Sequence, residues 1–84
     1  MRLPGATELL AYFERTNREY PNRHWENGAE ICRRWLTLQG QENVSQSEID
    51  AIMSRLKSEP NYGSGWFDLE IQFSRWARQR GLRA

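Results

Sequence analysis

Apolar residues recur three or four positions apart along most of this chain, which is the spacing of one face of an α-helix. The first such stripe predicts a helix over 7–20, with Thr7 as its N-cap. This helix ends before Pro21, because the residue that precedes a proline rarely adopts helical backbone angles. The second stripe begins near 25–27 and stops at Gly40, a residue type that commonly ends helices. These stripes predict a chain made mainly of helices.

The clearest helix start lies at Ser45. The sequence from Ser45 to Glu48 matches the capping box, in which a serine hydroxyl and a glutamate carboxylate each accept a hydrogen bond from the other residue's backbone N–H. A further apolar stripe follows and stops before Pro60. We therefore predict a third helix between Ser45 and Pro60.

The segment 66–74 fits two secondary structures. From Phe67 to Phe73, apolar and polar residues alternate, which is typical of a half-buried β-strand. The same segment also carries a helical stripe of Trp66, Leu69, Phe73 and Trp76. A lone strand would lack a partner for its backbone hydrogen bonds, because strand formers are scarce and Val44 is the only valine. We therefore predict a helix over about 65–80.

The length of the chain and its single cysteine limit how it can be stabilised. Eighty-four residues suffice for one domain, and one cysteine cannot form an internal disulfide. Four Trp, three Tyr and three Phe supply large apolar surfaces instead. We predict a single all-α domain over residues 1–84, a small four-helix structure built as two antiparallel helical hairpins around a core rich in Trp and Phe.

The two hairpins resemble an internal quasi-repeat. Trp25 and Trp35 coincide with Trp66 and Trp76 after a shift of 41 residues, and a Pro-Asn pair precedes each block. The tryptophans of each pair are ten residues apart, which places them on the same side of a helix. Two interpretations stay open. The rings are buried between the hairpins, or one ring of each pair is exposed and anchors an interface.

Few residues could support catalysis or metal binding. His24 and Cys32 are the only residues of their types, and about 12 Å of helix separates them, which is too far for a thiolate–imidazole pair. One histidine and one cysteine cannot build a zinc site, and no calcium-binding loop is present. We interpret Cys32 as a small buried residue and His24 as a turn or capping residue. The sequence predicts no enzyme activity, no cofactor and no metal.

Charge is unevenly distributed although the net charge is only +1. Residues 41–74 carry six acidic and two basic residues, whereas residues 75–84 carry four arginines and no acid. Cations at a helix C-terminus are favourable in themselves, and the alternative is that they bind a partner. The candidate basic binding residues are Arg33, Arg34, Arg75, Arg78, Arg80 and Arg83. The candidate acidic binding residues are Glu48, Asp50, Asp68 and Glu70.

Two binding functions fit this charge pattern. The first is a non-catalytic protein-binding module, a small regulator or inhibitor of a larger complex, that acts through arginine-rich and acidic surface patches. The alternative is a nucleic-acid-binding module that uses Arg33, Arg34 and the C-terminal arginines. Separate patches of opposite sign also leave a homo-oligomer as an open alternative. The sequence shows no export signal and no membrane-spanning stretch, so we expect a cytoplasmic protein without a membrane partner.

Overall fold

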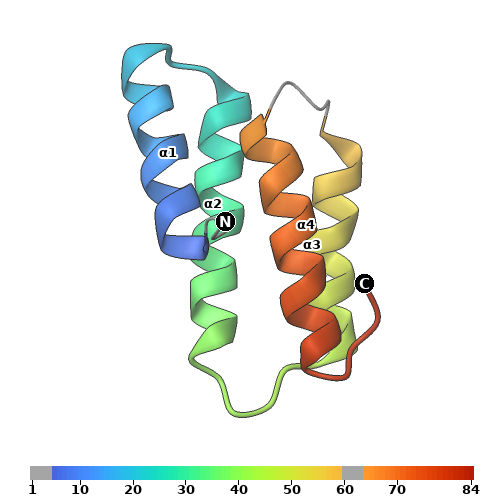
Figure 1. Ribbon diagram of the computed structural model, residues 1–84. Coiled ribbons are helices and arrows are strands. Elements are labelled where there is room, and N and C mark those ends of the chain that lie inside the picture. The colour runs from blue at the N-terminus through green and yellow to red at the C-terminus, as the bar shows by residue number, and fades with distance from the viewer. Residues whose placement is uncertain (1–4, 60–63) are drawn as a thin grey trace.

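The computed structural model describes residues 5–59 and 64–84, and these residues form helices and no strand (Figure 1). The helices are α1 (Ala6–Glu19), α2 (Arg23–Gln39), α3 (Gln46–Ser58) and α4 (Ser64–Gln79). Consecutive helices run antiparallel, so α1 and α2 form one hairpin and α3 and α4 form the other (Figure 1). The predicted all-α fold with two hairpins is confirmed. Pro60, before which the third helix is predicted to stop, lies outside the described residues.

The first helix starts one residue before its predicted cap. α1 begins at Ala6, Gly5 occupies the N-cap position, and Thr7 lies exposed within the first turn. The prediction of Thr7 as the N-cap is therefore wrong. Gly5 has extended backbone angles, as an N-cap residue requires, but no side chain that could accept a hydrogen bond from the helix.

The second helix also begins earlier than predicted. α2 starts at Arg23 rather than at 25–27. The cause is Asn22, whose side-chain oxygen accepts a hydrogen bond from the backbone N–H of His24 at 2.8 Å. The first turn of a helix has N–H groups without helical partners, and the Asn22 side chain satisfies that of His24, before the apolar stripe begins.

The predicted capping box at the start of α3 is confirmed. The Ser45 hydroxyl accepts a hydrogen bond from the backbone N–H of Glu48 at 3.2 Å, and the Glu48 carboxylate accepts one from the backbone N–H of Ser45 at 3.0 Å. The bonds from the backbone and side chain of Ser45 lower the pKa of Glu48, because they stabilise its charged form. Local chemistry alone therefore defines where α3 begins.

Replacing Ser45 with alanine should lower the free energy of unfolding by about 1 kcal/mol, because the Glu48 N–H loses its acceptor. Urea unfolding followed by circular dichroism measures this loss. Ser54→Ala is the matched control, because Ser54 is exposed in the middle of α3. An equal loss of stability in both variants would contradict a specific capping role for Ser45.

Residues 66–74 are helical, so the strand alternative is wrong. The helical stripe of Trp66, Leu69 and Phe73 is buried, while Phe67 and Ile71, which the strand pattern placed on the same face as Leu69, are exposed. In a helix these positions point in different directions, whereas in a strand they would share one face. The helix buries Trp66, Leu69 and Phe73 together against the other helices, which a strand could not do. This burial decides between the two patterns.

The two helix-ending glycines differ in conformation. Gly81 follows α4 with a φ of 82°, and its N–H donates to the carbonyl of Arg78 while the N–H of Leu82 donates to the carbonyl of Ala77. This is the Schellman motif, whose left-handed residue is usually glycine. Gly40 caps α2 at a φ of −84°, which any residue can adopt. The left-handed glycine therefore matters only after α4.

Aromatic rings join the two hairpins in the core. Phe13 of α1 packs edge-on against Trp66 of α4 with ring centroids 5.4 Å apart. Trp35 of α2 packs edge-on against Phe73 of α4 at 5.7 Å. α4 thus contacts both helices of the first hairpin through aromatic pairs, which prefer such edge-on geometry.

Two of the four tryptophans belong to the core, as the first interpretation predicts, and the other two only pack against it. Trp35 and Trp66 are buried, whereas Trp25 and Trp76 are partly buried against the core. Positions that the quasi-repeat equates therefore differ in burial, and the repeat stays a prediction. Not every ring fills the core, because Tyr20 is 70% exposed at the end of α1 and Phe67 lies on the surface.

A glycine permits the close packing of α1 on α2. A Cβ atom placed on Gly28 would lie 2.5 Å from the ring of Phe13, which is fully buried. The ring occupies the volume that any other side chain would need. Glycine at this position costs helix propensity, and the close approach of the two helices offsets that cost.

Candidate functional site

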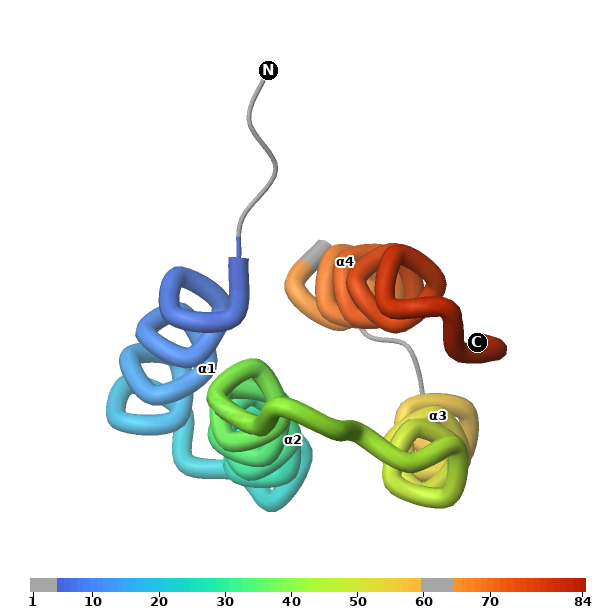
Figure 2. Tube along the Cα trace, turned by 90° about the horizontal axis from the view of Figure 1, so that it is seen from below, coloured from blue at the N-terminus to red at the C-terminus, as the bar shows by residue number. Residues whose placement is uncertain are grey.

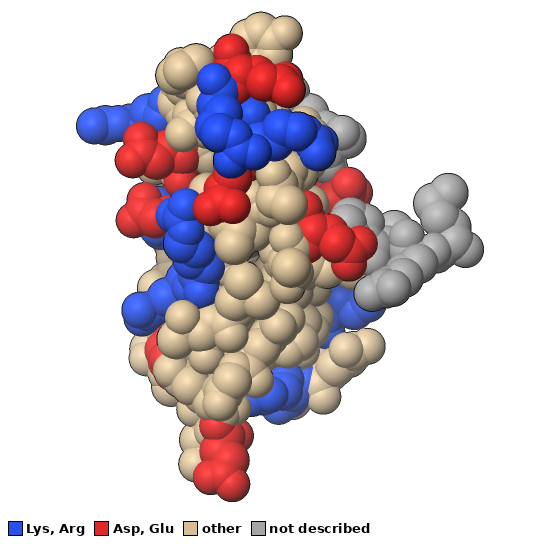
Figure 3. Space-filling model, turned by 90° about the vertical axis from the view of Figure 1, so that its left-hand side faces the viewer, with Lys and Arg blue, Asp and Glu red and all other residues tan. Residues whose placement is uncertain are grey.

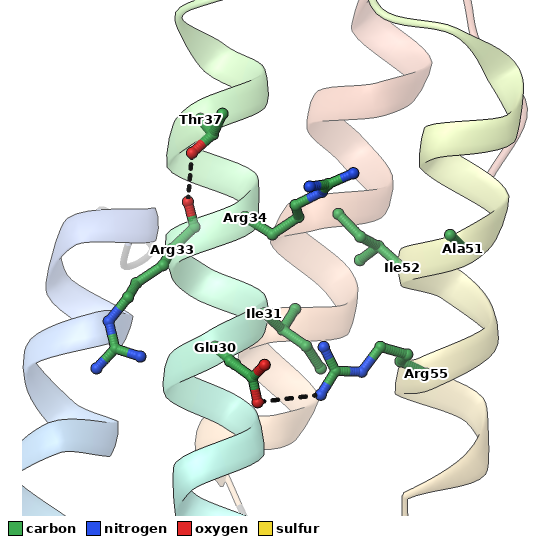
Figure 4. Close-up of a pocket in the computed structure, with 8 residues that line it drawn as sticks. All are labelled: Glu30, Ile31, Arg33, Arg34, Thr37, Ala51, Ile52 and Arg55. Atoms are coloured by element: carbon green, nitrogen blue, oxygen red, sulfur yellow. Dashed lines mark hydrogen bonds and ion pairs between the residues drawn. The ribbon is translucent and has the colours of Figure 1, made fainter.

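A groove lies between α2 and α3, the helices that residues 40–45 connect. α1 packs closely on α2, whereas α2 and α3 lie side by side without close packing (Figure 2). The groove has a volume of about 460 Å³, which is within the usual range of ligand sites. Its lining residues are Glu30, Ile31, Arg33, Arg34 and Thr37 of α2 and Ala51, Ile52 and Arg55 of α3 (Figure 4).

The floor of this α2–α3 groove is apolar. Ile31 is 0% exposed and Ile52 is 3% exposed, and both side chains point into the space between the helices (Figure 4). Glu30, Arg34 and Thr37 of α2 are three or four positions apart, so helix geometry puts them on one rim. An apolar floor below a polar rim suits a ligand that presents both kinds of group.

Two groove arginines already have carboxylate partners. Nη2 of Arg33 lies 3.0 Å from Oε2 of Glu14 on α1, and the Arg33 side chain points away from α3 (Figure 4). Nη2 of Arg55 lies 3.6 Å from Oε2 of Glu30, across the groove. All four side chains are 40–58% exposed, and exposed ion pairs contribute little to stability. A ligand carboxylate could therefore replace Glu30 beside Arg55 at little cost.

Arg34 is the groove cation without a partner among the described residues, since no hydrogen bond or ion pair joins its guanidinium to them. It is exposed, and its guanidinium extends over the groove toward α3 (Figure 4). Its charge reaches Glu48 at the start of α3, because Arg34 adds a minor contribution to the capping hydrogen bonds that lower the Glu48 pKa. Arg34 is therefore the cation most available to a ligand in this groove.

Two of the predicted binding arginines near the C-terminus contact the chain itself. Nη2 of Arg80 donates to the carbonyl oxygen of Gln41 at 2.8 Å, and its guanidinium lies 5.1 Å from the ring centroid of Trp76. Nη1 of Arg78 donates to the carbonyl oxygen of Ala84 at 3.2 Å. The bond from Arg80 joins the end of α4 to the loop after α2, and the bond from Arg78 joins α4 to residue 84.

The predicted acidic residues of α3 lie beside the basic C-terminal segment. The Gln46 side chain accepts a hydrogen bond from the Arg83 N–H at 2.9 Å and donates one to the Arg83 carbonyl at 2.8 Å. The same amide nitrogen donates to Asp50 at 2.9 Å. Glu48 and Asp50 therefore lie at the same end of the molecule as the C-terminal arginines, and do not form a distant acidic patch.

The acidic residues of α4 lie elsewhere. Asp68 and Glu70 belong to the first half of α4, at the opposite end of the second hairpin from the start of α3 (Figure 1). The structure therefore does not gather the four predicted acidic residues. Arg75 is exposed on α4 and does not line the α2–α3 groove.

Charges of opposite sign intermingle on the face that carries α1. Basic and acidic side chains alternate over the upper part of this face and form no large patch of one sign (Figure 3). One such pairing of opposite charges between helices is the ion pair of Arg33 on α2 with Glu14 on α1. A uniformly basic binding surface is therefore not present on this face.

His24 is buried in the first turn of α2 and Asn22 caps that helix, so the interpretation of His24 as a turn or capping residue is wrong. Its ring stacks on Trp66 with centroids 4.5 Å apart, and Nδ1 lies 3.2 Å from Oε2 of Glu59. Asn27 donates to the other oxygen of that carboxylate at 2.6 Å. This polar cluster joins the start of α2 to the end of α3, which spacing along the chain could not reveal.

Cys32 is buried as predicted, with no exposed surface. Burial raises the pKa of its thiol from 9.0 to about 12, so the residue stays protonated at neutral pH. Neither Cys32 nor His24 lines the α2–α3 groove. Within the described ranges, no group of three or more His, Cys, Asp or Glu residues could hold a metal ion.

The sequence indicated only part of this site. Arg33 and Arg34 were predicted as binding residues, and both line the groove. Arg55 and Glu30 were missed as site residues, although the polar face of α2 at three- and four-residue spacing is visible in the sequence. The placement of Arg55 opposite Glu30 depends on how α3 sits beside α2.

Comparisons with known proteins identify no relative. No family model, no curated protein and no solved structure matches this chain. In the part of the chain that the structure describes, no helix has the length and apolar character needed to cross a bilayer. The function must therefore be inferred from the site.

Proposed function

We propose that this chain is a non-catalytic protein-binding module whose α2–α3 groove receives a partner segment with apolar and acidic side chains. The observation that supports this most directly is the combination, in one groove, of a buried floor of Ile31 and Ile52 with the exposed guanidinium of Arg34. The floor suits an apolar side chain, and a guanidinium binds a carboxylate through two parallel hydrogen bonds. Apolar centres with arginine-bearing rims are typical of protein interfaces.

The charge arrangement favours a protein over a nucleic acid. Arg33 and Arg55 each lie beside a carboxylate, and Arg78 and Arg80 donate to carbonyl oxygens. Binding of a phosphate backbone relies on several cations at once, and nearby carboxylates oppose it. The alternative is nucleic-acid binding through Arg33, Arg34 and the C-terminal arginines. Crosslinking with a nuclease treatment distinguishes it from protein binding.

A module of this size would act by occupying a surface of its partner, and we propose that it regulates or inhibits a larger complex in this way. We further propose a cytoplasmic location. The single thiol needs no oxidising compartment, since it has no cysteine partner in the chain.

A photo-crosslinker at position 51 tests the proposed function, because Ala51 is exposed and lines the groove. We expect Ala51→p-benzoylphenylalanine to capture a protein in the native host, and the captured band to persist after nuclease treatment. Adding Arg34→Glu should reduce the capture about 10-fold, because the loss of one charge-assisted contact is worth at least ~1.4 kcal/mol.

Arg23→Glu is the matched control, because it makes the same charge change at an exposed site on α2 outside the groove. It should leave capture unchanged. Two results would contradict the groove as the binding site. One is equal capture from a crosslinker at the exposed Glu19, and the other is capture that Arg34→Glu leaves unchanged. Captured material that nuclease removes would establish the nucleic-acid alternative instead.

A further inference from the structure

Two large apolar side chains lie exposed on the outer side of α4. Phe67 is 53% exposed and Ile71 is 47% exposed. They are four residues apart, so they are neighbours on one side of the helix. The core, which takes in most of the other large apolar side chains of the described residues, does not include them. Adjacent exposed apolar side chains of this size indicate an interaction surface.

A pair of opposite charges lies beside these apolar residues on α4. Asp68 and Arg75 are seven residues apart, almost two helical turns, and therefore lie on the same side of α4. Arg75 is exposed and Asp68 is partly exposed. Among the described residues, neither side chain forms a hydrogen bond or ion pair. We call Phe67, Asp68, Ile71 and Arg75 together the α4 outer face.

We propose that the α4 outer face binds the same face of a second copy of this chain, with the two α4 helices antiparallel. A two-fold axis midway between residues 71 and 72 places Asp68 of each copy at the same height as Arg75 of the other, since both lie 3.5 residues from the axis. It also places the Ile71 side chains of the two copies against each other. The face is therefore complementary to itself in charge and in the contact between the two Ile71 side chains.

The order of charges on this face favours a second copy over a different partner. Asp68 precedes Ile71 and Arg75 follows it, so a reversed copy supplies the opposite charge on both sides of Ile71. A single pair of helix faces buries less than the ~800 Å² per partner of a standard interface. We therefore expect a weak dimer, with a dissociation constant on the order of 10⁻⁴ M. The α2–α3 groove is formed by other helices and stays open in this dimer.

Sedimentation equilibrium of the full chain tests the dimer, with three charge-reversal samples. A homodimer of Asp68→Arg places an arginine opposite an arginine at both contacts, and a homodimer of Arg75→Asp places an aspartate opposite an aspartate. Each should raise the dissociation constant at least about 10-fold. An equimolar mixture of the two variants should restore dimerisation, because each Arg then meets an Asp at both contacts. Circular dichroism checks that each variant keeps its helices.

Lys57→Glu is the control, since it reverses an exposed charge on α3 away from this face and should leave the dissociation constant unchanged. A wild-type chain that stays monomeric at ~1 mM would overturn the proposal. So would a mixture of the two variants that dimerises no better than either alone.

Discussion

Replacing Trp35 with alanine should lower the free energy of unfolding by about 3–5 kcal/mol. Trp35 is 3% exposed and packs edge-on against Phe73 and Trp76 of α4, so its removal leaves a cavity between the hairpins. Such a loss is a large part of the total stability of a small domain. Urea unfolding followed by far-UV circular dichroism measures it without relying on tryptophan fluorescence.

Trp76→Ala is the matched control for this cavity. Trp76 is only partly buried and carries the Arg80 guanidinium on its exposed side, so its loss should cost about 1–2 kcal/mol. Equal and small losses in the two variants would show that Trp35 is not a core residue. The contrast between them measures how firmly α4 is packed on α2.

Raising the pH should destabilise the fold through Cys32. Its thiol has a pKa of about 12 in the folded chain and about 9 when unfolded, so only the unfolded chain loses this proton between pH 9 and 12. The contribution is fully present below pH 9 and declines as the pH rises, by about 1.4 kcal/mol per unit. At pH ~10.5 the loss should reach about 2 kcal/mol relative to pH 8.

Cys32→Ala isolates this effect, because both proteins share every other titrating group. The variant should lose less stability than the parent chain between pH 8 and ~10.5, with the difference near 2 kcal/mol. Identical pH dependence in the two proteins would contradict a strongly raised thiol pKa. Urea unfolding at the two pH values supplies all four free energies that the comparison needs.

Much of the helical structure was predictable because its causes are local. The capping box of Ser45 and Glu48 involves atoms three residues apart, and the apolar stripes of α2 and α4 show which side of each helix is buried. The ambiguity at 66–74 was resolved by a general requirement, that a strand needs a partner. The errors at Thr7 and at the start of α2 arose at helix ends, where one cap decides the boundary.

The candidate site was predictable only in part. Arg33 and Arg34 could be selected as arginines on a helix, but their different roles could not. Arg33 forms an ion pair with Glu14 of α1, whereas Arg34 extends over the groove (Figure 4). In the same way, the basic C-terminal segment was visible as charge, whereas its attachment to Gln41 and Gln46 was not.

The sequence by itself determined the helices and their apolar sides, because these depend on residues a few positions apart. The tertiary structure alone decided which charged side chains meet, which cation stays available and where the groove opens. Those outcomes depend on how Trp66 and Phe73 of α4 pack on the first hairpin, because that packing sets the position of α3 beside α2. Contacts between residues 20 to 40 positions apart follow from that packing, and sequence periodicity does not encode them.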